Sequence, residues 1–146
     1  MEPAPDYTDY DTRLGAYVVI GDDQDRVLLA LWNEPEVPVW TLPGGGVELH
    51  ESAEQGAVRE AKEETGYDVE LGRLLGVATR VVPPEGRVGE PGRERWLRHV
   101  HVAFEATVTG GDLVAEVDGT TDEARWFPRS RVAGLARTEQ VRRFVG

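Results

Sequence analysis

The 146-residue chain contains no cysteine, which excludes disulfides, thiolate metal sites and a cysteine nucleophile. It also has no apolar run approaching the roughly 20 residues that a membrane-spanning helix needs. The first ten residues, MEPAPDYTDY, are polar and acidic and lack the apolar centre of a signal peptide. We therefore expect a soluble, intracellular protein, most simply a cytoplasmic one.

Basic residues are scarce as well. The chain has 16 lysines and arginines against 27 acidic residues, for a formal net charge of −11. Such a balance argues against non-specific binding to nucleic acid or to an anionic membrane, because both require basic patches. If the substrate is itself anionic, metal cations must mediate its contact with the protein.

The pattern of apolar residues predicts one α/β domain. Residues 1–12 are predicted to be a flexible leader and residues 13–146 a single domain. β-Branched and apolar segments predict strands at 14–20, 26–32, 68–82, 96–108 and 123–127. An Asp-rich turn is expected to join the first two strands as a hairpin. The exposed sheet edge expected around residues 14–32 is a candidate surface for a homodimer. Strands mixed with two helices favour a sheet covered by helices.

The strongest helix signal begins after residue 52. Ser52 and Gln55 form a capping-box pair, and Gly66 stands where a left-handed C-terminal cap is expected. Small residues between them, including Ala57 and Ala61, form a stripe at helical spacing, which would let the helix lie close against a sheet. A second, amphipathic helix is predicted over residues 130–146.

Three carboxylates gather on the first of these helices. Glu60, Glu63 and Glu64 occupy positions i, i+3 and i+4, which share one face of a helix. Two interpretations fit: a solvated charged face, or a metal site. A set of carboxylates without histidine or thiolate suits the hard ions Mg²⁺ and Mn²⁺, which can activate water and neutralise a phosphate under attack.

The sequence around this helix follows a longer pattern. Residues 45–67, GGVELHESAEQGAVREAKEETGY, fit the pattern G-x5-E-x7-R-E-U-x-E-E-x-G-U, with U a hydrophobic residue. The seven fixed places are filled by Gly45, Glu51, Arg59, Glu60, Glu63, Glu64 and Gly66. At background residue frequencies, such a match arises on the order of once in 10⁸ windows. The segment resembles the signature box of the Nudix hydrolases, and the preceding WTLPGGGVE resembles that family's usual approach to it.

The resemblance implies a mixed β-sheet between α-helices and hydrolysis of a phosphoanhydride bond in a nucleoside diphosphate derivative. It implies a divalent metal, Mg²⁺ or Mn²⁺, held by Glu60, Glu63 and Glu64 with the backbone carbonyl of Gly44. Gly45 and Gly66 would support this loop–helix–loop. Glu51 would assist near the metal or pair with Arg59, and Arg59 would organise the carboxylates.

The catalytic base is left open between two groups of glutamates. Water attacking phosphorus must lose a proton to a carboxylate within hydrogen-bond reach. We favour Glu60, or Glu64 if the metal claims Glu60. The distal candidates for base or metal ligand are Glu105, Glu116 and Glu123.

The substrate is less strongly specified. Trp40 could stack a nucleobase, and Arg80 and Arg98 could clamp phosphate, although core packing and solvent-facing arginines are alternatives. Pro83 lies 16 residues after Tyr67, which looks like a marker of ADP-ribose pyrophosphatases, and nucleoside triphosphates and oxidised nucleotides also remain open. His99 and His101 share one strand face, without a third metal ligand nearby.

Two other functions are known on the same fold. A Nudix-fold ligand sensor that binds without cleaving would often have a degraded box, whereas this box is complete. Isopentenyl diphosphate isomerase chemistry needs a cysteine, and the chain has none.

Overall fold

A computed structural model of the chain describes residues 3–87, 94–114 and 121–146. The elements in chain order are β1 (Asp11–Gly21), β2 (Arg26–Trp32), β3 (Val39–Thr41), β4 (Gly44–Gly46), α1 (Ala53–Thr65), β5 (Tyr67–Val82), η1 (Pro84–Gly86), β6 (Leu97–Gly111), β7 (Thr121–Pro128), η2 (Arg129–Gly134) and α2 (Glu139–Phe144), where η marks a 3-10 helix. None of the helices in this described part is long and apolar enough to cross a membrane.

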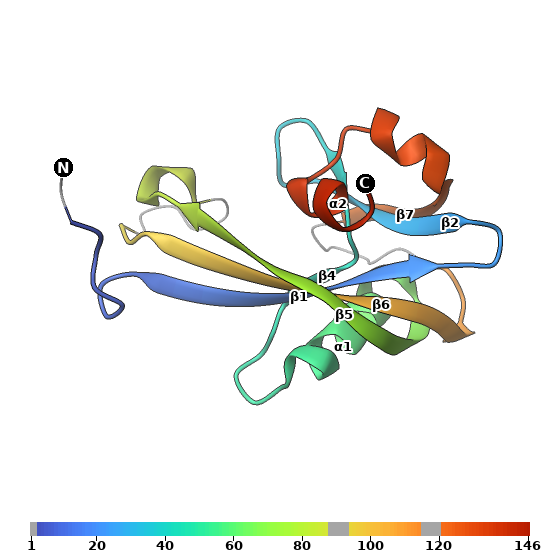
Figure 1. The fold of residues 1–146 in the computed structure, drawn as a ribbon, viewed down its shortest axis with the longest axis horizontal. Helices are drawn as coiled ribbons and strands as arrows, with labels where there is room; N and C mark the ends of the chain where they lie inside the picture. The colour runs from blue at the N-terminus through green and yellow to red at the C-terminus, as the bar shows by residue number, and fades with distance from the viewer. Residues whose placement is uncertain (1–2, 88–93, 115–120) are drawn as a thin grey trace.

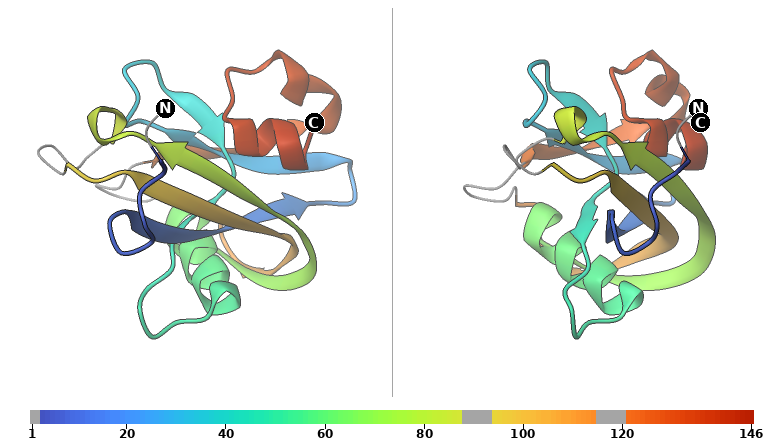
Figure 2. Two further views of the ribbon diagram at one scale, coloured as in Figure 1. Left: turned by 60° about the vertical axis from the view of Figure 1, so that its left-hand side comes forward. Right: turned by 90° about the vertical axis from the view of Figure 1, so that its left-hand side faces the viewer.

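The strands form one mixed sheet in the order β3-β2-β1-β6-β5, with β4 also paired to β1 and β7 to β2. The pairing of β1 with β6 is parallel, whereas β2 and β4 pair with β1 in the antiparallel sense. Figure 1 shows α1 on one side of β1, β6 and β5 and α2 on the other, and the views in Figure 2 show the same arrangement. The predicted fold, a mixed sheet between helices, is confirmed.

Strand β1 is central, and its residues are buried on both faces. Ala16, Val18 and Ile20 belong to the core on the α1 side, whereas Val19 belongs to the core on the opposite side. This alternation follows from the two-residue period of a strand.

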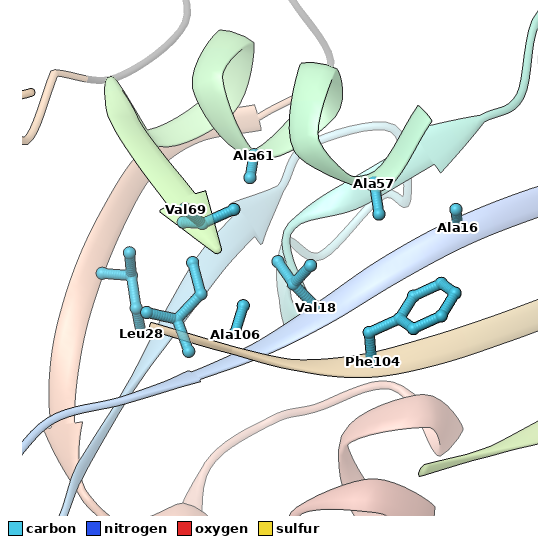
Figure 3. Close-up of a cluster of buried hydrophobic side chains, with 9 residues drawn as sticks. Ala16, Val18, Leu28, Ala57, Ala61, Val69, Phe104 and Ala106 are labelled. Atoms are coloured by element: carbon cyan, nitrogen blue, oxygen red, sulfur yellow. The ribbon is translucent and has the colours of Figure 1, made fainter. Parts of the chain in front are cut away.

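The core on the α1 side depends on small residues. Ala57 and Ala61 of the helix are fully buried and point at Val18, Val69 and the neighbouring sheet residues (Figure 3). Because alanine adds only a methyl group, the helix lies close against the sheet, as its sequence predicts. The opposite face of α1 is left for charged residues.

The core on the other side is closed by the C-terminal segment. Val132 of η2 and Val141 of α2 are buried there against Leu29 and Leu42. The single helix predicted over residues 130–146 is wrong, since two short helices are separated by an extended link. In that link the backbone N–H of Trp40 donates to the Ala136 carbonyl at 2.8 Å, so pairing with β3 replaces helical hydrogen bonds.

Two further expectations need correction. Strand β1 begins at Asp11, where parallel pairing with Leu97 begins, so the ordered sheet starts two residues before the predicted boundary at residue 13. The segment 14–32 is not a sheet edge, because β1 lies between β2 and β6, and β2 lies between β1 and β3. The strands at the ends of the path are β3 and β5.

Candidate active site

Helix α1 is fixed at both ends by the predicted caps. The Ser52 side chain accepts from the backbone N–H of Gln55 at 3.0 Å, and the Gln55 side chain accepts from the N–H of Ser52 at 2.8 Å. Gly66 ends the helix in the left-handed conformation, with φ of 82°, and donates to the Lys62 carbonyl. The helix thus has a defined start and end, and the burial of Ala57 and Ala61 fixes which face lies against the sheet.

Glu64 joins this helix to strand β4. Its side chain is almost fully buried, and Oε2 accepts a hydrogen bond from the backbone N–H of Gly44 at 2.9 Å. Gly44 has a φ of 152°, and a Cβ there would collide with the Ala16 carbonyl oxygen. Only glycine fits at this position, and it brings a backbone peptide beside a buried carboxylate.

Arg59 gathers the other box carboxylates. Its Nε and Nη2 donate to the two oxygens of Glu51 at 2.8 Å each, and Nη1 donates to Glu60 at 3.0 Å. Further hydrogen bonds run from Nη1 to Glu63 at 3.2 Å and from Nη2 to the Gly46 carbonyl at 2.9 Å. The hydrogen bonds from Arg59 lower the pKa of Glu51 to about 2, helped by a backbone N–H, and those same bonds to Glu51 raise the pKa of Arg59. One guanidinium therefore offsets the repulsion among three carboxylates.

The donor chemistry of this cluster fits a hard divalent cation. Every side-chain donor is a carboxylate oxygen, and the Gly45 backbone passes so close to Glu60 that a Cβ would lie 2.8 Å from its carboxyl carbon. Within the residues that the structure describes, no three acidic or histidine side chains converge in ligand geometry. Glu60 and Glu63 are paired with Arg59, so a metal would compete with that guanidinium.

A second group of polar residues lies beside the box on the sheet face opposite α1. We call it the histidine face and define it as Arg13, Tyr17, Arg80, His99 and His101. Burial raises the pKa of Tyr17 to about 12, and the charges of Glu64 and Glu60 add to the increase. Tyr17 is paired with Gly44 in the sheet, so it lies beside the start of the box.

The histidine face is connected to helix α2. Gln140 Nε2 lies 2.5 Å from His101 Nδ1, and Gln140 Oε1 accepts from the Thr41 hydroxyl at 3.1 Å. The rings of Tyr17 and His101 are 5.0 Å apart. The sequence placed the two histidines on one strand face, but it carried no signal that Gln140, 39 residues away, would contact His101.

The distal glutamates are not gathered with the box. Glu105 pairs with Arg73 at 3.2 Å and Glu123 with Arg125 at 3.0 Å. In the described part of the chain, neither has a hydrogen bond or ion pair with a box residue. Glu116 lies outside the described residues.

The predicted substrate contacts lie in three places. Trp40 packs edge-on against Phe127 with ring centroids 4.7 Å apart. Arg80 is opposite His99 on the histidine face. Arg98 adjoins His99 in sequence and therefore points to the other face, where it donates to the Tyr10 hydroxyl at 3.4 Å.

Comparison with known proteins identifies the family. The model of the NUDIX domain matches residues 11–144. The chain is 35% identical over 119 residues to a provisionally named 8-oxo-dGTP diphosphatase of Bacillus subtilis, covering 81% of this chain and 68% of that protein. It is 33% identical over 118 residues to an ADP-ribose pyrophosphatase of Methanocaldococcus jannaschii, covering 81% and 63%. A NUDIX hydrolase structure from Nitrosomonas europaea superposes with a TM-score of 0.75 at 22% identity, over 92% of this chain and 86% of that one.

The chain therefore belongs to the Nudix hydrolase family, as its box predicted. Its reaction class follows: it is a pyrophosphohydrolase that cleaves a phosphoanhydride bond in nucleotide derivatives.

Proposed function

We propose that Glu60, Glu63 and Glu64, together with the carbonyl of Gly44, bind Mg²⁺ or Mn²⁺ for hydrolysis of a nucleoside diphosphate derivative. The observation that carries this proposal is the junction of Glu64 with Gly44, where a buried carboxylate accepts from the backbone N–H at 2.9 Å. It places the Glu64 carboxylate against the Gly44 peptide, whose carbonyl this proposal assigns to the metal. When bound, the metal supplies charge neutralisation at phosphate oxygens and a more acidic water.

The protein's own groups then position the attack. Arg59 holds Glu51, Glu60 and Glu63 by charge-assisted hydrogen bonds and so limits their movement. Glu60 accepts the proton of the attacking water, and Glu64 takes this role if Glu60 is fully engaged as a ligand. Arg59 is a positioning residue, since its contacts run to the carboxylates and to the Gly46 carbonyl.

The substrate class is a nucleotide with a diphosphate or triphosphate group. Relatives named for an oxidised deoxyguanosine nucleotide and for ADP-ribose support this breadth. The alternative is a sensor that binds such a nucleotide without turnover; the complete box favours the enzyme. Cytoplasmic location and a homodimer stay predictions from the sequence.

A nucleotide panel tests the proposal directly. ADP-ribose, 8-oxo-dGTP and the ordinary nucleoside triphosphates are incubated with Mg²⁺ or Mn²⁺, and phosphate, pyrophosphate and nucleotide products are measured. We expect turnover of at least one member that stops with chelator and returns when metal is added. Tight binding without turnover would support the sensor, and turnover unaffected by chelator would contradict the metal-dependent mechanism.

Single substitutions assign the base. Glu60→Gln is expected to lower kcat by roughly 10²–10⁴-fold, the usual contribution of general-base catalysis. Glu105→Gln and Glu123→Gln serve as matched controls with near-normal turnover. Mn²⁺ affinity, measured by electron paramagnetic resonance, separates the loss of a ligand from the loss of a base. Near-full turnover by Glu60→Gln would transfer the role to Glu64 or to a distal glutamate.

A further inference from the structure

A row of three side chains crosses the sheet on the histidine face. His99 of β6 is paired on one side with Arg13 of β1 and on the other with Arg80 of β5. Directly paired residues project from the same face of a sheet. Since neighbouring strands lie about 4.8 Å apart, the two arginine Cα atoms are roughly 10 Å apart, with His99 between them. Flexible arginine side chains can close on a group held over His99.

His101 adds a hydrogen-bond donor to this row. Its ring lies 3.9 Å from that of His99, centroid to centroid. Because Gln140 Oε1 accepts from Thr41, the Gln140 amide presents Nε2 to His101 Nδ1, which must accept. The proton of the neutral ring is then on Nε2. That atom is buried, and among the described residues it has no hydrogen-bond partner.

The surroundings favour an anionic ligand here. A buried donor without an acceptor is destabilising until a ligand or water supplies one. Arg80 is exposed, and within the described part of the structure no carboxylate forms an ion pair with it. The chain as a whole has a net charge of −11, whereas the two arginines that flank His99 make this part of the sheet locally cationic. Guanidinium groups match phosphate oxygens in geometry and charge.

We propose that the histidine face binds a phosphate group of the nucleotide, through contacts that do not involve the metal of the box. The two sites are adjacent, because Gly44 donates to Glu64 of the box and is paired in the sheet with Tyr17, whose ring lies beside His101. The proposal rests on the proposed function only for identifying the ligand as a nucleotide. The histidine face would hold a phosphate while the box acts on the phosphoanhydride.

Metal-free protein separates this site from the box. With chelator present, the box carboxylates repel anions, so saturable binding of phosphate compounds must come from elsewhere. The chain has three histidines, and His50 is exposed outside the histidine face, so ring-proton NMR reports on the site with an internal control. Sodium pyrophosphate, added at pH 7 with chelator, is expected to shift the ring signals of His99 and His101 but not those of His50.

The same titration reports the charge of the ligand. Burial, the neighbouring His101 and the charges of Arg13 and Arg80 lower the pKa of His99 to about 4. A bound phosphate beside the ring favours the charged form and should raise that pKa. Sodium chloride at matched ionic strength should leave it unchanged.

Arginine variants decide the assignment. Arg80→Gln and Arg13→Gln are expected to weaken pyrophosphate binding by about tenfold each, in line with charge-assisted hydrogen bonds. Arg98→Gln, on the opposite face of the sheet, is the matched control and should bind as the unaltered protein does. Shifts that follow ionic strength alone, or that persist in both Arg80→Gln and Arg13→Gln, would overturn the proposal.

Two further measurements identify which kind of phosphate group binds and whether it contributes to substrate binding. AMP in place of pyrophosphate tests a phosphate monoester against a phosphate chain, and saturable binding of either at the histidine face supports the site. With a substrate from the panel, Arg80→Gln should raise KM about tenfold with little change in kcat. A lower kcat at unchanged KM would contradict a binding role, whereas absent turnover in every variant would concern the proposed function alone.

Discussion

The box and the histidine face lie near each other but are built in opposite ways. The box, residues 45–67, is one continuous segment whose hydrogen bonds mostly join residues within 13 positions of each other. The histidine face draws on β1, β5 and β6, and its link to Gln140 spans 39 residues. The first is acidic and organised by one arginine, whereas the second is neutral to basic. The proposed cleavage site is therefore encoded locally in the sequence, whereas the proposed phosphate site depends on the tertiary fold.

The two regions meet at Gly44 and Tyr17. Gly44 donates to Glu64 on the box side, and a Cβ on it would come within 2.5 Å of the Tyr17 ring on the other side. The two proposed sites thus share a boundary at Gly44 that leaves no room for a Cβ.

The first prediction, with the greatest expected loss of stability and turnover, concerns a substitution at Gly44. Gly44→Ala places a side chain at φ of 152° and against the Ala16 carbonyl and the Tyr17 ring. Backbone strain alone costs about 1–3 kcal/mol, and we expect a melting temperature lower by several degrees together with loss of turnover. Calorimetry and panel kinetics measure both.

Gly46→Ala is the matched control for that substitution. Nothing lies within 4 Å of a Cβ at Gly46, so stability and turnover should stay close to those of the unaltered protein. Equal damage from the two substitutions would show that the β4 segment responds as a whole, without a special role for Gly44.

The second prediction concerns the box alone. Arg59→Gln leaves Glu51, Glu60 and Glu63 without their shared cation. We expect turnover or Mn²⁺ affinity to fall about 10–100-fold, the usual cost of losing a group that orients metal ligands. Arg73→Gln removes an exposed ion pair with Glu105 and is expected to change neither. Anion binding at the histidine face should survive Arg59→Gln, and its loss would show that the two regions are coupled.

This contrast explains how much of the molecule the sequence could predict. Caps at Ser52 and Gly66 and the spacing of the glutamates are local features, so helix α1 and the carboxylate cluster were predictable. The break in the C-terminal helix was not, since it depends on pairing of residue 136 with Trp40 across nearly one hundred positions. The same holds for Gln140, which looks like an ordinary polar residue of an amphipathic helix. Packing of α2 against the sheet makes it a contact of His101.

The third prediction concerns how the stability of the protein depends on pH through the two histidines of the histidine face. Burial is the main cause that lowers the pKa of both His99 and His101 to about 4, and the nearby charges of Arg80, with Arg13 for His99, act in the same direction. Between the ordinary value near 6.5 and 4, the unfolded chain binds protons that the folded protein does not. Stability is therefore fully present above pH 6.5 and falls as the pH is lowered toward 4.

Thermal unfolding between pH 7 and pH 5 tests this sign. The melting temperature should fall with pH, and His99→Gln combined with His101→Gln should flatten that dependence. His50→Gln, at an exposed position, should leave it as it was. An unchanged slope in the double variant would mean that the carboxylates, and not the two histidines, control stability in this range.

The smallest expected effect comes from the link between the histidine face and helix α2. Gln140→Leu keeps the approximate size of the side chain but removes its hydrogen bonds to His101 and Thr41. Each net hydrogen bond contributes about 1 kcal/mol, so the melting temperature should fall by a few degrees. The NMR signal of His101 should move while that of His50 does not, because the tautomer of His101 is no longer fixed by an amide donor. Glu139→Gln, one residue earlier in α2, is the control. If Gln140→Leu leaves the His101 signal in place, the imidazole is oriented by its ring contacts with Tyr17 and His99, and the histidine face is set by β1 and β6 without the C-terminal helix.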